Sequence, residues 1–176
     1  MIRLLGSGAI LNECLKAHEI LKQFDITSEV WSVTSFNMLR KDGMEIENVN
    51  LKNPSQTPQA SYVEQSFAHE NIPAVAATDY MRAYAEQIRP FVKGTYFTLG
   101  TDGFGRSDSR KKLREYFEVD ANNIAATAAY ALLQDQTIDK KQVGKIYEKL
   151  GINKDKSSPW VCLLYTSDAA DEFSCV

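Results

Sequence analysis

The sequence has few residues that bind metals or form disulfides, and it has no long hydrophobic run. Its 176 residues include three cysteines and two histidines: Cys14, Cys162, Cys175, His18 and His69. The cysteines are spaced neither as a disulfide framework nor as a metal site, and neither histidine has a set of partners around it in the sequence. No apolar run approaches the roughly 20 residues that span a bilayer. We therefore expect no metal-binding residue, no redox site and no membrane partner.

An excess of positive charge is absent as well. The formal net charge is -3, and the three acidic residues near the end of the chain account for it: Asp168, Asp171 and Glu172. No basic footprint for nucleic acid remains, so we expect no nucleic-acid partner. The opening stretch MIRLLGSGAIL is too short and too soon interrupted by glycine for a signal peptide. These features predict a cytoplasmic protein.

The residues that are present predict one α/β domain. A hydrophobic content of 44% with 24% charged residues is typical of a soluble globular protein. Short apolar runs predict strands at 2–5, 29–34, 73–78 and 95–100. Helical spacing of apolar residues predicts helices over 10–24, 62–69, from Asp79 to about Pro90, 109–117, 122–134 and 139–150. This alternation predicts a three-layer α/β sandwich with a mostly parallel sheet.

Some segments have weaker patterns. Residues 36–50 indicate only one short amphipathic turn, and 51–61 indicate a loop. For the helix from Asp79 we expect an apolar stripe with an Arg82–Glu86 pair on its wet side, and Pro90 should kink or end it. The expected stripe is Met81, Tyr84, Ala85, Ile88 and Phe91. Asp139 and Gly151 fit the start and end of the last helix.

Two glycine-containing turns could carry chemistry. Gly6-Ser7-Gly8 lies where a nucleotide-binding fold places its phosphate turn, but Leu11 stands where a third glycine is needed. A tight strand-to-helix turn is the favoured interpretation. The loop LGTDGFGRSDSR, residues 99–110, could be an active site, a structural hinge or an interface loop. Ser107 has no histidine nearby to activate it, so hinge or interface is favoured, with Ser107 or Asp108 starting the next helix.

A basic cluster follows this loop. Arg106, Arg110, Lys111, Lys112 and Arg114 could meet an acidic partner or a phosphate. Acidic neighbours offset the cluster, so a solvated helix face is favoured. His18 and His69 are interpreted as ordinary packing or surface residues.

The run LGTDGFGRSDSRKKLREYFEVDA resembles the C-terminal domain of the homodimeric, thiamine-diphosphate-dependent pyruvate dehydrogenases. RLLGSGAIL, VWSVTSFNMLRKDG, ATDYMRAYAEQIRPFV and INKDK resemble the same domain in the same order. The resemblance covers about residues 2–159 and implies the transketolase C-terminal fold. For a full-length parent it implies decarboxylation of pyruvate on thiamine diphosphate with magnesium, and transfer of the acetyl group to the lipoyl group of an acetyltransferase component.

The same resemblance implies that this chain carries no catalytic, cofactor-binding or metal-binding residue. In that family the cofactor belongs to the two preceding domains. The nearest string to their magnesium motif here, Lys41-Asp42-Gly43, lacks the first glycine and the asparagine pair. We therefore expect an inactive fragment with a structural and dimer-contact role, whose partners are the remaining domains of its own chain, a second subunit and the lipoyl acetyltransferase component.

The end of the chain departs from the family. Residues 1–160 are interpreted as the domain. Residues 161–176 are interpreted as a non-native tail, because CLLYTSDAADE resembles a translated sequencing adapter. Two alternatives stay open: a non-catalytic dimerisation or partner-binding module, and a small nucleotide-binding protein that uses Gly6-Ser7-Gly8.

Overall fold

A parallel sheet lies at the centre of the chain. The computed structural model describes residues 1–67 and 71–159, and within those ranges the sheet has four strands in the order β2-β1-β3-β4. The strands are β1 (Ile2–Gly6), β2 (Ser28–Ser32), β3 (Ala74–Ala77) and β4 (Tyr96–Leu99). All neighbours are parallel, with Leu4 paired to Val30 on one side and Val75 on the other. The α/β prediction is therefore confirmed.

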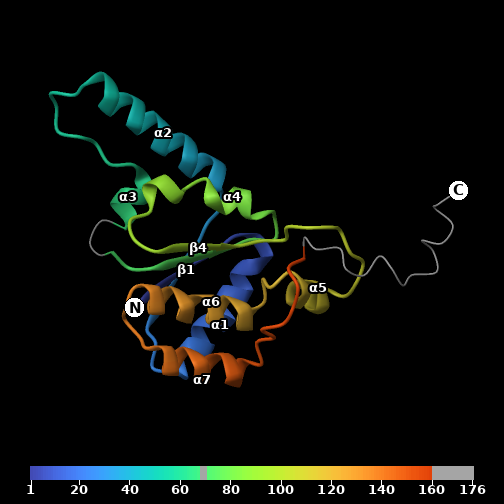
Figure 1. The fold of residues 1–176 in the computed structure, drawn as a ribbon. Coiled ribbons are helices and arrows are strands. Elements are labelled where there is room, and N and C mark those ends of the chain that lie inside the picture. The colour runs from blue at the N-terminus through green and yellow to red at the C-terminus, as the bar shows by residue number, and fades with distance from the viewer. Residues whose placement is uncertain (68–70, 160–176) are drawn as a thin grey trace, which may run out of the picture.

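Helices cover both faces of this sheet (Figure 1). One face carries α1 (Leu11–Lys22), α6 (Ala121–Gln134) and, outside them, α7 (Lys140–Leu150). The other face carries α2 (Phe36–Lys52), α3 (Tyr62–Ser66) and α4 (Arg82–Glu86). The short elements η1 (Gly8–Ile10), η2 (Arg89–Phe91) and α5 (Arg110–Tyr116) complete the described chain. The predicted three-layer sandwich is thus the observed architecture.

Each face of the sheet has its own hydrophobic core. On the α1 side, small residues of α6 such as Ala125 and Ala128 are fully buried and let that helix pack closely against α1 and β3. On the α4 side, Phe36, Phe67 and Phe91 are buried together beneath the helices. Burial of both faces explains why the central strand β3, Ala74–Ala77, is an apolar run without alternation.

The last helix forms where its capping residues predict. The Asp139 side chain accepts a hydrogen bond from the Gln142 backbone amide and the Gln142 side chain accepts one in return, which makes a capping box. Gly151 ends the helix in the left-handed conformation, with φ of 66°. The Asp120 and Ser109 side chains cap α6 and α5 by accepting from the backbone amides of Asn123 and Lys112. The prediction that Ser107 or Asp108 starts α5 is wrong by one or two residues.

Two helix predictions on the other face need correction. Residues 36–50 form not one short turn but most of α2, a helix of 17 residues. Its glycine, Gly43, lies directly against the Phe91 ring, so no side chain fits between helix and core. The predicted 62–69 helix ends at Ser66, with Val63 and Phe67 buried as expected.

The helix expected from Asp79 is shorter than predicted. It begins at Arg82 and ends at Glu86, and Pro90 lies in the separate turn η2. Of the predicted stripe, Ala85, Ile88 and Phe91 are buried, whereas Met81 and Tyr84 are exposed. The loop after β4 occupies the space into which the helix would have extended.

No helix among the described residues is both long and apolar enough to cross a membrane.

Candidate functional site

The loops after β1, β3 and β4 meet at the carboxyl edge of the sheet. A cavity of about 530 Å³ lies between them and α5, with Ile10, Asp79, Thr101 and Arg110 among its lining residues. The chain leaves β1 toward β2 on one side, while β3 lies on the other side of β1. Ligands of open α/β sheets bind at such switch points, so this edge is the candidate site of the fold.

The Gly6-Ser7-Gly8 turn is structural. The Ser7 amide donates to the Ala77 carbonyl at 3.1 Å, which continues the β1–β3 ladder into the turn. Gly8 has φ of 57°, and the Asp79 carboxylate lies 3.3 Å from the position that a Cβ on Gly8 would take. A carboxylate beside the turn repels a phosphate. The geometry therefore favours the tight-turn interpretation.

The loop after β4 is bound to the segment after β3. The Thr101 amide donates to the Tyr80 carbonyl at 2.9 Å, and its hydroxyl donates to the Asp79 carbonyl at 2.8 Å. The Asp102 carboxylate accepts from the Arg82 amide at 3.1 Å and lies 3.4 Å from the Arg82 guanidinium. Residues 99–102 therefore hold the start of α4 in place. The side chains of Thr101 and Asp102 make these structural contacts and do not form a pair of nucleophile and base.

Replacing Asp102 with alanine should lower the free energy of unfolding by about 1 kcal/mol, because the α4 amide loses its side-chain acceptor. Urea unfolding followed by circular dichroism measures this difference. Asp155→Ala, at an exposed position beyond α7, is the control and should change stability by less than about 0.5 kcal/mol. Equal effects of the two substitutions would contradict the capping role of Asp102.

The buried carboxylate of Glu13 joins three helices. It accepts from Lys16 and from Arg114, each at 2.8 Å, and from the Ala121 amide at 3.2 Å. Burial acts to raise the pKa of Glu13, but the bonds to Lys16 and Ala121 and the charge of Arg114 outweigh it, so the pKa lies below its ordinary value. Glu13 is therefore ionised and fastens α5 and α6 to α1. No motif in the sequence marks it.

The basic cluster divides into different roles. Arg114 is the partner of Glu13, and Arg106 stacks over the Tyr116 ring with its guanidinium carbon 4.9 Å from the ring centroid. Arg110, Lys111 and Lys112 are exposed, with Lys112 4.0 Å from Asp108. Arg110, Lys111 and Lys112 therefore lie on a solvated helix face, as predicted. The same prediction is wrong for Arg114, which pairs with the buried Glu13.

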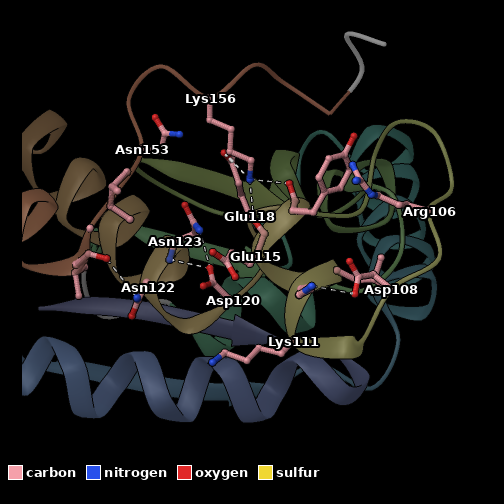
Figure 2. A pocket seen from close by; sticks show the side chains of 16 residues that line it. Arg106, Asp108, Lys111, Glu115, Glu118, Asp120, Asn122, Asn123, Asn153 and Lys156 are labelled. Carbon is pink, nitrogen blue, oxygen red and sulfur yellow. Dashed lines mark hydrogen bonds and ion pairs between the residues drawn. The ribbon is translucent and has the colours of Figure 1, made fainter. Parts of the chain in front are cut away.

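A polar groove of about 670 Å³ runs between α5, the start of α6 and residues 150–156. Figure 2 shows Lys156 reaching across it toward Glu118, and the Asp120–Asn123 hydrogen bond within it. The Lys156 ammonium donates to the Glu115 and Tyr116 carbonyls at 2.7 and 2.8 Å, so it caps the end of α5. Both acidic and basic side chains line the walls of the groove. These contacts give the groove a structural role in fastening the segment after α7.

Exposed apolar side chains gather near the carboxyl edge. Tyr80 and Tyr84 have ring centroids 5.2 Å apart, and Tyr80, Met81 and Phe104 are each more than half exposed. All come from the two loops that Thr101 and Asp102 bind together, or from the helix next to them. Exposed aromatic and methionine side chains on a rigid support are typical of protein interfaces. This surface agrees with the interface interpretation of the loop.

The string that comes nearest in the sequence to a magnesium–diphosphate motif makes structural contacts. Lys41, Asp42 and Gly43 lie in α2, where the Asp42 carboxylate accepts from the Tyr62 amide at 2.6 Å and Gly43 packs on Phe91. Among the described residues no group of three His, Cys, Asp or Glu side chains is placed to hold a metal ion. Asp42 and Gly43 therefore serve helix and core contacts and are not arranged around a diphosphate-bound metal.

Two of the residues singled out in the sequence, His18 and Cys14, lie among the described residues. The His18 Nδ1 lies 2.8 Å from the Ser28 hydroxyl, a contact between α1 and β2. Cys14 is buried, which raises the pKa of its thiol to about 12. His69 and the predicted tail, with Cys162 and Cys175, lie outside the described residues.

Residues 1–120 match the family model of the transketolase-like C-terminal domain. The chain belongs to the transketolase-like C-terminal domain family. This finding agrees with the parallel sheet and its order, and it confirms the resemblance seen in the loop after β4.

The chain is also similar to several pyruvate dehydrogenase E1 components. The chain is 48% identical to the pyruvate dehydrogenase E1 component of Pseudomonas aeruginosa over 163 residues, which is 92% of this chain and 18% of the relative. Identity is 46% over 160 residues with the Escherichia coli K12 protein and 42% over 159 residues with the Cupriavidus necator protein, each 90% of this chain and 18% of the relative. The chain thus spans about a fifth of the length of these relatives.

Proposed function

We propose that this transketolase-like C-terminal domain is the structural and dimer-contact domain of a pyruvate dehydrogenase (acetyl-transferring). The parent decarboxylates pyruvate on thiamine diphosphate with magnesium and passes the acetyl group to the lipoyl group of an acetyltransferase component. The observation that carries this proposal is the 42–48% identity to pyruvate dehydrogenase E1 components across nine tenths of the chain. The domain itself contributes no catalytic, cofactor-binding or metal-binding residue.

The site geometry supports an assembly role. The carboxyl-edge loops are occupied by their own hydrogen bonds, and their apolar side chains face outward. Such a surface becomes stable when another protein surface covers it. The partners are the remaining domains of the same polypeptide and a second subunit, in the cytoplasm. Residues 1–160 form the domain, and residues 161–176 are a non-native tail.

The purified chain should show no decarboxylation of pyruvate when thiamine diphosphate and magnesium are added, because under this proposal the cofactor site belongs to the other domains of the parent. Release of carbon dioxide from labelled pyruvate measures this directly. The control is the full-length parent, which should turn over pyruvate only when thiamine diphosphate is present. Turnover by the chain alone would contradict the fragment's inactivity, and a full-length protein without this activity would contradict the proposed parent.

A further inference from the structure

The outer half of α2 extends beyond the rest of the fold. The helix starts at Phe36, just after the carboxyl end of β2, and by Gly43 it has reached Phe91, which precedes the amino end of β4. Residues 44–52, here called the α2 arm, continue past that point for about 13 Å at 1.5 Å per residue. Figure 1 shows the arm projecting from the layer that contains α3 and α4. It lies on the side of the sheet at which β1 begins.

Contacts within the described chain support this arm poorly. None of its nine residues is buried, whereas the inner half of α2 buries Phe36 and Gly43. Asn48, Asn50, Ile46 and Val49 are weaker helix formers than alanine or leucine, and a helix of this length is marginal without packing. Intrinsic helix propensity therefore does not explain why the arm is helical.

The arm nevertheless presents a defined surface. The Asn50 side chain exchanges two hydrogen bonds of 2.8 Å with the Gln59 backbone, which ties the following loop back to the helix. Met44 and Leu51 are seven residues apart and so lie on one face, and Leu51 is 80% exposed. Leu51 is the most exposed large apolar side chain among the described residues, and together with Met44 it offers apolar surface that a partner could cover.

Resting on the proposed function, we propose that the α2 arm docks on the part of the parent chain that precedes residue 1, with Met44 and Leu51 as its contacts. More than four fifths of the Pseudomonas aeruginosa relative lies outside the matched region, which is 18% of it. Since β1 begins at Ile2, any preceding residues reach the sheet at its amino end, the side on which the arm projects. The proposal commits to the preceding region as the occupant, because the arm and the amino end of β1 lie on the same side of the sheet.

Thiol labelling in the full-length protein tests this docking. Leu51→Cys is compared with Lys145→Cys, an exposed α7 position on the opposite side of the sheet. We expect iodoacetamide to modify Cys at position 51 at least tenfold more slowly than at position 145, as measured by mass spectrometry of the labelled peptides. Equal rates, or faster labelling at position 51, would overturn the proposal.

A photoreactive amino acid at position 51 identifies the occupant. A crosslinked peptide from residues that precede this domain supports the proposal, and one from a second copy of this domain overturns it. The pyruvate assay is run on the same preparation. An active enzyme with a freely labelled position 51 refutes only the docking, whereas a full-length protein without thiamine-diphosphate-dependent turnover refutes the proposed function.

Discussion

Replacing Glu13 with alanine should lower the free energy of unfolding by about 3 kcal/mol, whereas Glu19→Ala on the same helix should change it by less than about 0.5 kcal/mol. Both side chains are carboxylates on α1, but only 7% of the Glu13 side chain is exposed against 68% for Glu19. Loss of Glu13 leaves Arg114 and the Ala121 amide without this acceptor. Because Lys16 is well exposed, it contributes little to the loss.

Urea unfolding at neutral pH measures both variants. Glu13→Gln is a useful third variant, because it keeps the shape of the side chain and removes the charge. If Glu13→Ala and Glu19→Ala were equally stable, the three-helix junction would have no energetic importance. If Glu13→Gln matched the wild type, packing and not charge would explain the effect of Glu13→Ala.

The stabilisation by Glu13 should also depend on pH in a defined direction. The pKa of Glu13 in the folded chain lies below its ordinary value of 4.5, so the carboxylate favours folding once it is ionised. The stability difference between wild type and Glu13→Gln should be complete above about pH 5 and should shrink as pH falls through the folded pKa. Other titratable groups are the same in both proteins, so their contributions to the pH dependence cancel in the difference. One such group is Glu86, whose pKa is lowered mainly by its bond to Arg89. A difference that grew toward acid pH would contradict this assignment.

Local sequence patterns predicted the parts of the fold whose causes are local. The strand β3 could be recognised because both of its faces are buried and its residues form an apolar run. The helix α7 could be recognised because Asp139, Gln142 and Gly151 are capping residues at fixed offsets. The four strands and their alternation with helices followed from such signals, and so did the fold class.

Other features depend on residues far apart in the sequence. Arg114 lies 101 positions from Glu13, so a count of neighbouring charges placed it on a solvated face. The start of α4 depends on Asp102, 20 positions later, which the local apolar spacing could not include. The helix α2 has weak formers and a glycine, and its inner half forms because Gly43 allows close packing on Phe91. Tertiary contacts decided the structure in each case, and periodicity does not report them.

Gly100→Ala should be among the most damaging small substitutions in the chain, while Gly105→Ala, five residues later in the same loop, should be nearly neutral. A Cβ on Gly100 would lie 2.6 Å from the Arg82 amide nitrogen and 2.6 Å from the Tyr80 carbonyl oxygen. Both are backbone atoms, so neither can move as a side-chain end would. No atom lies within 4 Å of a Cβ built on Gly105.

The added methyl group must therefore separate the two loops at the carboxyl edge of the sheet. Their separation weakens the Thr101–Tyr80 bond and the Asp102 cap of α4 together, so we expect a loss of about 3 kcal/mol, at the upper end of the range for overpacking. Urea unfolding measures the loss, and faster hydrogen exchange at the Thr101 and Arg82 amides would locate it. A Gly100→Ala variant as stable as Gly105→Ala would mean that the loops are not fastened together at this point. Of the three glycines in LGTDGFGRSDSR, only Gly105 lies outside such contacts. The backbone requires glycine at Gly100, and also at Gly103, where φ is 113° and a Cβ would lie 2.6 Å from the Pro159 carbonyl oxygen.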